Sequence, residues 1–355
     1  MTIEELYKVF LESEGISTDT RQDIKGTLFF ALKGERFDGN KYVQEALKTG
    51  CRLAVTEVKE YEGDPGICYT PSALRLLQDL AAYHRKQAAP QVLAITGSNG
   101  KTTTKELIAA VLSRRFFVLA TKGNLNNHIG VPLTLLSLDK EEVAVIEMGA
   151  NHPGEIGMLA GIASPDVGLI TNVGKAHLEG FGSLKGVLDA KGELYENLAA
   201  SGGEAIVDGL DKVLLDKAST CAVKVLRVGP GLALPVSLLL KAQAPYLEVE
   251  LQIGEEQFPV ATHLVGDYNL QNIRLAAACG LKFGVPGKDI AEAISAYVPE
   301  NQRSQLVEGE SNRLILDSYN ANPTSMRVAV EGLTAYTGKP LPVLSRIPVD
   351  SYRPY

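Results

Sequence analysis

The chain has 355 residues, of which 45% are apolar and 22% charged, and this composition predicts two or three folded domains. Its formal net charge of −7 argues against nucleic-acid binding, because contacts to a phosphate backbone need clustered Lys and Arg. The sequence has no run of 18 apolar residues and no signal-peptide pattern, so we expect no membrane insertion and a cytoplasmic location. Four widely spaced cysteines without a CxxC pair indicate reduced thiols and argue against structural zinc.

The first 88 residues predict a small α/β domain. A helix is expected over 2–14, a short buried strand at TLFFAL (27–32) and another strand at CRLAVTEV (51–58). A helix over 72–87 follows, and QAAP (87–90) has the composition of a linker. These features predict a first domain over residues 1–88.

Residues 89–300 predict a central domain with a mostly parallel sheet. The apolar strands QVLAIT (91–96), VAVIEMG (143–149) and DVGLITNVG (166–174) alternate with helical patterns. That alternation is typical of parallel strands joined by helical crossovers. Residues 246–266 indicate an antiparallel hairpin, and 269–284 a helix that ends at a glycine.

A second boundary is expected near VPENQR (298–303), before a strand at RLILDSY (313–319). Residues 301–355 are then a partial third domain, because about fifty residues are too few for the usual open sheet.

The stretch TGSNGKTTTKE (96–106) predicts a phosphate-binding loop between a strand and a helix. Glycines allow successive backbone N–H groups to face an anion, and the helix N-terminus adds its positive dipole end. Lys101 would contact the β- and γ-phosphates, and the Thr102 hydroxyl would bind magnesium. Only two residues separate these glycines, against four in the usual phosphate loop, but the flanking strand and helix favour nucleotide binding.

Three further polar residues lie near predicted strand ends or in helices. Glu147 ends a strand, and beside a phosphate loop a magnesium ligand is favoured over a surface carboxylate. His177 lies in a Gly-rich loop, where a solvated histidine is the commoner case. Lys191 lies in the helical pattern LDAKGELYENL, which by itself indicates a solvated lysine.

The sequence resembles the Mur ligase family over roughly residues 15–343. The resemblance is carried by residues 17–39 and 96–106, KGNLNNHIGVPLTLL, EMGANHPGEI, AHLEGFGS, AKGELYENL, DYNLQNIRLAAA and DSYNANPTSM. Three of these, NLNNHIGVP, EMGANHPGEI and DSYNANP, favour the member that adds D-Ala-D-Ala to UDP-MurNAc-tripeptide over the sibling that adds the third stem residue. The resemblance implies an N-terminal UDP-sugar-binding domain, a central ATPase domain and a C-terminal Rossmann-like α/β domain.

The resemblance also implies the site residues. The UDP part of the substrate is held by Ser17, Asp19, Thr20 and Arg21, and the reacting substrate faces Asn126 and Asn127. ATP is bound by the loop Gly97, Ser98, Asn99, Gly100, Lys101, Thr102 and Thr103, by Asn269 and Asn272 on the adenine side, by Arg303 on a phosphate, and by Asp317 on the ribose or nucleotide. Thr102 and Glu147 bind a first magnesium ion, and His177 and a carbamylated Lys191 place a second.

The implied reaction is an ATP-dependent, ADP-forming amide ligation in peptidoglycan precursor synthesis. A carboxylate becomes an acyl phosphate, which the amine of D-Ala-D-Ala then attacks, so no protein nucleophile is needed. Lys101, Glu147, His177 and Lys191 form the implied catalytic group, and a monomer is expected.

Two alternatives stay open. One is another phosphate-loop enzyme, such as a kinase or a folylpolyglutamate-type ligase, although STDTRQDIKG argues for a UDP-sugar site. The other is a non-catalytic remnant that binds ATP and UDP-sugar. The ending SRIPVDSYRPY does not fit the family pattern, so we expect a truncated or frame-shifted third domain in which RLILDSY and LPVL lack partner strands, with impaired ligation.

Overall fold

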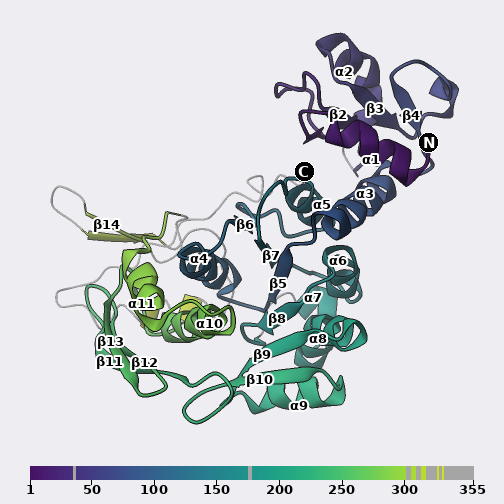
Figure 1. The fold of residues 1–355 in the computed structure, drawn as a ribbon. Coiled ribbons are helices and arrows are strands. Elements are labelled where there is room, and N and C mark those ends of the chain that lie inside the picture. Colours follow the sequence, from purple (N-terminus) through teal and green to yellow (C-terminus); the bar gives the residue numbers. More distant parts are fainter. Residues whose placement is uncertain are drawn as a thin grey trace.

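The computed structural model describes residues 1–34, 37–174, 178–300, 305–308, 313–316, 326–327 and 330–331. Its N-terminal part is a four-stranded parallel sheet with flanking helices (Figure 1). The strands, in their order in the sheet, are β1 (Ile16–Ser17), β2 (Leu28–Phe30), β3 (Leu53–Thr56) and β4 (Ile67–Tyr69). The helices are α1 (Ile3–Leu11), α2 (Val43–Thr49) and α3 (Ala73–Ala88), with 3₁₀ turns η1 (Gly39–Tyr42) and η2 (Lys59–Tyr61).

Helix α1 starts at Thr2 because a capping box satisfies its first backbone N–H groups. The Thr2 hydroxyl accepts from Glu5 N at 3.3 Å, and Thr2 N donates to the Glu5 carboxylate at 2.8 Å. The expected helix is therefore confirmed, although it ends at Leu11, earlier than predicted.

The central part contains a six-stranded sheet that is parallel throughout, which confirms the α/β prediction. Its order is β10–β9–β8–β5–β7–β6. The strands are β5 (Gln91–Thr96), β6 (Val118–Ala120), β7 (Val143–Glu147), β8 (Val167–Ile170), β9 (Glu204–Asp208) and β10 (Lys224–Val228). Their carboxyl ends meet at one edge, called here the carboxyl edge of the sheet.

Both faces of this sheet are covered by helices because alternate strand residues enter two separate cores. Val92 and Ala94 belong to one core, with residues of α3 and of α5 (Gly130–Leu135), α6 (Glu155–Ala163), α8 (Leu184–Ser201) and α9 (Lys212–Thr220). Leu93 and Ile95 belong to the other, with α4 (Lys101–Leu112), α10 (Asn269–Lys282) and α11 (Gly287–Ala296). The short helix α7 (Leu178–Phe181) precedes α8.

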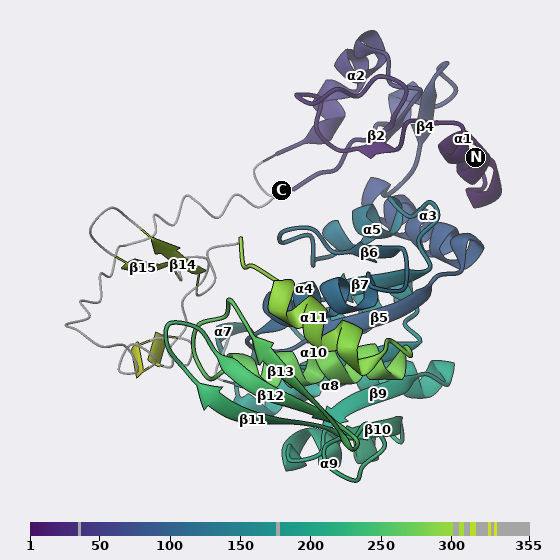
Figure 2. The ribbon, with the colours of Figure 1, turned by 60° about the vertical axis from the view of Figure 1, so that its left-hand side comes forward.

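The expected hairpin is confirmed and has a third strand. The antiparallel sheet consists of β11 (Val236–Ala242), β12 (Glu248–Ile253) and β13 (Glu256–Ala261). Its apolar face, including Val249 and Leu251, joins the core around α10 and α11. Figure 2 shows this sheet on the outer side of those helices.

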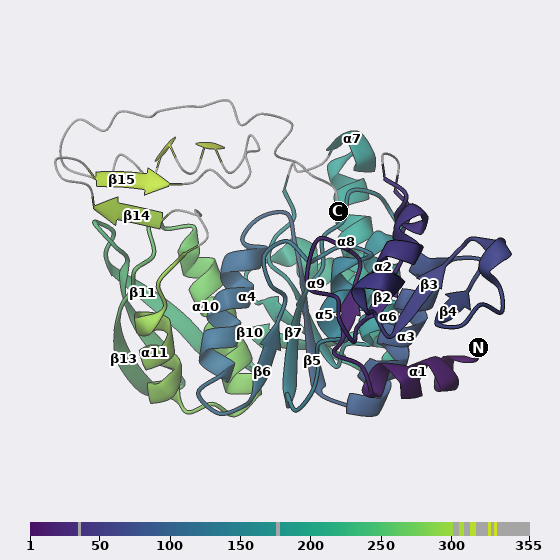
Figure 3. The same ribbon diagram turned by 90° about the horizontal axis from the view of Figure 1, so that it is seen from above.

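The strand expected at RLILDSY has a partner, so the prediction that it lacks one is wrong. Strand β15 (Arg313–Leu316) pairs antiparallel with β14 (Gln305–Glu308). LPVL lies outside the described residues. Figure 3 shows the paired strands β14 and β15 and the N-terminal part on opposite sides of the central sheet. The domain boundaries near residues 88 and 300 remain predictions. No helix in the described ranges is long and apolar enough to cross a membrane.

Candidate nucleotide and metal site

The predicted phosphate loop, Gly97–Gly100, connects β5 to α4 at the carboxyl edge of the sheet. Two of its positions require glycine. Gly97 has φ +149°, and a Cβ there would lie 1.9 Å from Thr171 Oγ1. Gly100 has φ +76°, and a Cβ there would lie 2.5 Å from Asn272 Oδ1. The glycines that favoured a phosphate loop in the sequence are therefore also required by close packing.

The end of strand β8 fixes the loop in place. Asn172 O accepts from Ser98 N at 2.9 Å, and Asn172 Oδ1 accepts from Asn99 N at 3.0 Å. The Thr171 hydroxyl donates to Asn99 O at 2.6 Å. Neither Thr171 nor Asn172 was assigned a role from the sequence, although polar residues directly after a buried strand are a signal for this edge of a parallel sheet.

Lys101 begins α4 and extends back over the loop. Its Nζ donates to Gly97 O at 2.8 Å and contacts Ser98 O at 3.4 Å. The ammonium group therefore lies beside the loop and the positive end of the α4 dipole. Thr102 and Thr103 occupy the first turn of the same helix, and Thr102 is buried. This arrangement favours a polyanionic ligand.

Glu147 ends β7, next to the strand that leads into the loop, and its side chain is almost completely buried, with 2% exposed. Its Oε1 accepts from Asn126 Nδ2 at 2.8 Å. Its Oε2 is buried without a hydrogen-bond partner in the described part of the chain. A buried carboxylate oxygen without a partner is costly unless a cation binds it, so Glu147 fits a magnesium ligand.

Lys191 lies on α8 and is buried, with 3% of the residue exposed. The Phe181 ring centroid is 5.9 Å from its Nζ, and no carboxylate within the described ranges pairs with it. Burial, and then the positive charge of Lys101, lower the pKa of Lys191 to about 7. The solvated lysine that the local pattern indicated is therefore wrong. A large fraction of this amine is uncharged at neutral pH, which makes it nucleophilic.

Asn269 and Asn272 lie on α10 against the phosphate loop. Asn272 Oδ1 accepts from the Thr104 hydroxyl at 3.1 Å, and Asn272 Nδ2 donates to Asn269 Oδ1 at 2.8 Å. Asn269 Nδ2 donates to Val265 O at 2.8 Å. Both amides are buried beside the phosphate loop. Contact of either residue with adenine stays a prediction.

Asn126 and Asn127 occupy the loop before α5, but their side chains have different roles. Asn126 contacts Glu147, whereas Asn127 Oδ1 accepts from Ile129 N at 3.0 Å and from Gly130 N at 2.8 Å. Asn127 thereby stabilises the start of α5. Direct contact of either side chain with substrate stays a prediction.

The predicted UDP-binding residues lie in the N-terminal part, in and just after β1. The Ser17 hydroxyl donates to Asp19 O at 3.1 Å. The Asp19 carboxylate pairs with exposed Arg21 at 2.6 Å, and this hydrogen-bonded pair lowers the pKa of Asp19. Thr20 lies between them, half-buried. These residues form a compact polar turn, whose role in binding UDP stays a prediction.

Three predicted residues, His177, Arg303 and Asp317, lie outside the described residues. Within the described ranges no cluster of three or more His, Cys, Asp and Glu side chains could hold a metal ion. The pairing of the Glu147 carboxylate with the Thr102 hydroxyl at a first metal ion stays a prediction.

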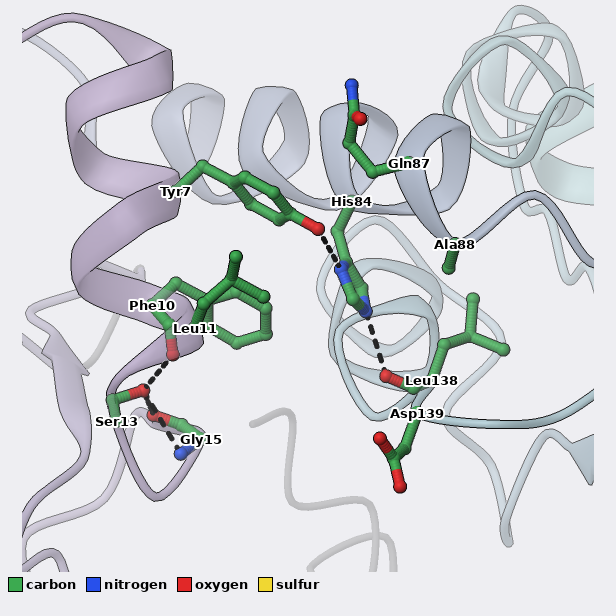
Figure 4. A pocket seen from close by; sticks show the side chains of 10 residues that line it. All are labelled: Tyr7, Phe10, Leu11, Ser13, Gly15, His84, Gln87, Ala88, Leu138 and Asp139. Atoms are coloured by element: carbon green, nitrogen blue, oxygen red, sulfur yellow. Dashed lines mark hydrogen bonds between the residues drawn. The ribbon is translucent and has the colours of Figure 1, made fainter.

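A hollow of about 330 Å³ lies between α1, the end of α3 and the loop before β7 (Figure 4). His84 forms its wall: His84 Nε2 contacts Leu138 O at 2.9 Å, and His84 Nδ1 contacts the Tyr7 hydroxyl at 3.2 Å. Leu138 precedes β7, so this hollow is at the edge of the central sheet opposite the phosphate loop. Because both ring nitrogens have partners, this histidine has a structural role at the junction.

The family profile described as "Mur ligase middle domain" matches residues 95–280. The chain is 37% identical over 339 residues to the UDP-N-acetylmuramoyl-tripeptide–D-alanyl-D-alanine ligase of Escherichia coli, covering 94% of this chain and 75% of that protein. It is 35% identical over 337 residues to the ligase of the same name from Bacillus subtilis, covering 93% of this chain and 72% of that protein.

Solved structures of this ligase have the same fold. A crystal structure of MurF from Acinetobacter baumannii has a TM-score of 0.85 and 34% identity, covering 95% of this chain and 77% of that chain. The MurF ligase of Thermotoga maritima in complex with ADP has a TM-score of 0.81 and 29% identity, covering 93% of this chain and 76% of that chain. A folylpolyglutamate synthase from Thermotoga maritima, with 14% identity and a TM-score of 0.57, shares the fold alone.

Proposed function

This chain belongs to the Mur ligase family, and we propose that it joins D-Ala-D-Ala to UDP-MurNAc-tripeptide with ATP, forming ADP and phosphate, in peptidoglycan precursor synthesis. The observation that carries this proposal is the carboxyl edge of the central sheet. There the phosphate loop and Lys101 follow β5, and the adjacent strand β7 ends in Glu147, whose buried Oε2 has no hydrogen-bond partner among the described residues. We further propose a cytoplasmic monomer, with the polar turn at Ser17–Arg21 binding the UDP group.

The reaction must first turn a carboxylate into an electrophile. The terminal carboxylate of the tripeptide attacks the γ-phosphorus of ATP, the bond to the bridging oxygen breaks, and ADP leaves. The loop and the N-terminus of α4 hold the phosphates, and Lys101 offsets the negative charge that accumulates on them.

The amine of D-Ala-D-Ala then attacks the carbonyl carbon of the acyl phosphate. The nitrogen loses a proton, the tetrahedral intermediate collapses, and phosphate leaves with the pair of electrons of the broken C–O bond. Catalysis here is positioning and charge stabilisation, since no protein atom forms a covalent bond with the substrate.

Magnesium fits the residues at this edge. When bound, it neutralises phosphate charge and fixes the geometry of phosphoryl transfer. Glu147 Oε2 and the Thr102 hydroxyl would hold one ion. We propose that Lys191 is carbamylated and, with His177, holds a second ion. The lowered pKa of Lys191 supports this, because only an uncharged amine reacts with CO₂. Carbamylation forms an N–C bond and releases one proton.

Ligation is tested directly by incubating the chain with UDP-MurNAc-tripeptide, D-Ala-D-Ala and Mg-ATP and identifying the product by mass spectrometry. We expect UDP-MurNAc-pentapeptide and one equivalent of ADP. ATP turnover with a folate and glutamate, but not with the UDP substrate, would favour the folylpolyglutamate-type alternative. Nucleotide binding without any product would favour the non-catalytic one.

A further inference from the structure

The two proposed ligands of the first metal ion lie on different elements. Thr102 is in the first turn of α4, whereas Glu147 is the last residue of β7. A cation that binds both needs their separation to be fixed to within a few tenths of an ångström. The structure contains a buried connection between these two elements that the proposed reaction does not use.

Lys105, one turn after Thr102 on α4, provides the first half of this connection. It is almost completely buried, with 2% exposed, and its Nζ donates to Thr121 O at 2.7 Å. Its Nζ lies 3.7 Å from Glu106 Oε1, too far for a hydrogen bond. A buried ammonium group is costly, and an apolar residue would fill the same space without that cost.

Thr121 provides the second half. It follows β6 and is buried, and its hydroxyl oxygen accepts from Glu147 N at 2.9 Å. Its own N–H donates to Val145 O at 3.0 Å, which continues the ladder between β6 and β7. Thr121 therefore contacts Lys105 through its carbonyl group and Glu147 through its side chain.

We propose that Lys105 and Thr121 are positioning residues that fix the Glu147 carboxylate relative to the Thr102 hydroxyl. Asn126 orients the carboxylate through Oε1, and the Lys105–Thr121 connection holds the backbone that carries it. The inference rests on the proposed function in one respect, the assignment of Thr102 and Glu147 to a magnesium ion.

The alternative is that Lys105 only satisfies a buried carbonyl group. That role affects the free energy of unfolding but not the affinity for magnesium. The two roles are therefore separated by measuring metal affinity and stability on the same variants.

The experiment uses Lys105→Met, Thr121→Val and Thr121→Ser in the full chain. Binding of a non-hydrolysable ATP analogue is measured by calorimetry as Mg²⁺ is titrated, and the melting temperature is recorded in parallel. We expect Lys105→Met and Thr121→Val to weaken Mg²⁺ affinity by about 10–100-fold, as for other residues that orient metal ligands. Affinity for the analogue without Mg²⁺ should not change. Thr121→Ser keeps the hydroxyl and should retain wild-type Mg²⁺ affinity.

Lys282→Met is the control. Lys282 is partly buried, and its Nζ pairs with Glu204, the first residue of β9, at the edge of the sheet opposite the phosphate loop. This variant should lower the melting temperature and leave Mg²⁺ affinity unchanged. Wild-type Mg²⁺ affinity in both Lys105→Met and Thr121→Val would overturn the inference. If Lys105→Met fails to fold, the comparison of Thr121→Val with Thr121→Ser still tests the inference.

The ligation assay on the wild-type chain keeps the two proposals apart. A wild-type chain that binds Mg²⁺ with the analogue but makes no pentapeptide overturns the proposed function, while the shift in Mg²⁺ affinity still supports the positioning role. A wild-type chain that makes the pentapeptide, with variants of unchanged Mg²⁺ affinity, overturns only the positioning role.

Discussion

The two edges of the central sheet differ in whether their polar groups have hydrogen-bond partners. At the carboxyl edge, Glu147 Oε2 and Thr96 Oγ1 are buried without a hydrogen-bond partner in the part of the chain that is described. Lys191 is buried there too, with a lowered pKa. Such groups cost free energy in the folded protein, which is typical of a site that a ligand completes.

At the opposite edge, the buried His84 and the exposed Asp166 both have hydrogen-bond partners. His84 bridges Tyr7 and Leu138, as Figure 4 shows. Asp166 accepts from Val92 N at 2.8 Å and from Arg85 at 3.1 Å. Leu138 O can only accept, so His84 Nε2 carries the proton and Nδ1 accepts from the Tyr7 hydroxyl. The difference separates polar groups that serve a ligand from those that hold the fold together.

The largest expected effect comes from Lys101→Met. It removes the cation beside the phosphate loop, so we expect ligation to fall by about a hundredfold to a thousandfold, the usual cost of removing one charge-stabilising group. Calorimetry with an ATP analogue should show weaker binding, and circular dichroism an unchanged fold. The control is exposed Lys288→Met, which should keep full activity. If Lys101→Met binds the ATP analogue as tightly as the wild-type chain, the carboxyl edge is not the nucleotide site.

Glu147→Gln tests whether the buried Oε2, which has no hydrogen-bond partner among the described residues, lowers stability and supports metal binding. The amide keeps the shape and removes a buried charge, so the melting temperature in magnesium-free buffer should stay the same or rise. Activity should fall by about a hundredfold, because a bound magnesium ion stabilises the charge of the transition state by several kcal/mol. Wild-type protein should be stabilised by Mg²⁺ with nucleotide, and the variant should not. A variant that is both less stable and fully active would contradict the comparison.

Carbamate formation on Lys191 should depend on pH. The pKa of this residue, about 7, lies below the usual value for lysine, so the uncharged fraction increases as pH rises through 7. A carbamate signal from ¹³C-bicarbonate, followed by NMR, should therefore increase between about pH 6 and pH 8. Lys191→Arg should lose the signal and about tenfold to a hundredfold of activity. Exposed Lys185→Arg, on the same helix, is the control. A signal that persists in Lys191→Arg would assign the carbamate elsewhere.

The smallest effect is expected at the opposite edge. Tyr7→Phe removes the donor to His84 Nδ1, so the free energy of unfolding should fall by about 1 kcal/mol. Ligation rate and Mg²⁺ affinity should not change, since this junction lies away from the phosphate loop. Denaturant unfolding and the ligation assay measure both quantities. A large loss of activity without loss of stability would mean that the opposite edge also serves the reaction.

Lys191 shows how a buried lysine can be taken for a solvated one in a sequence that contains the signal for burial. Val187 and Leu194 are buried on α8, and Lys191 lies four residues after the first and three before the second. Helical periodicity therefore places it on the buried face. A charged side chain on a helix is usually solvated, and only the resemblance to the family indicated a role for this lysine.

The sequence by itself determined the parallel α/β architecture and the phosphate loop, because both depend on local patterns: apolar runs that alternate with helical spacing, and glycines between a strand and a helix. It predicted the three-residue strand β2 from an apolar run, but it did not reveal β4 and β6, which are equally short and show no period. Only the tertiary structure decided which side chains support the loop and the carboxylate. Asn272 lies 172 positions after Gly100 in the chain, and Thr121 lies 26 before Glu147. Such contacts depend on how α10 and β6 pack against their neighbours, and no local pattern of residues encodes that packing.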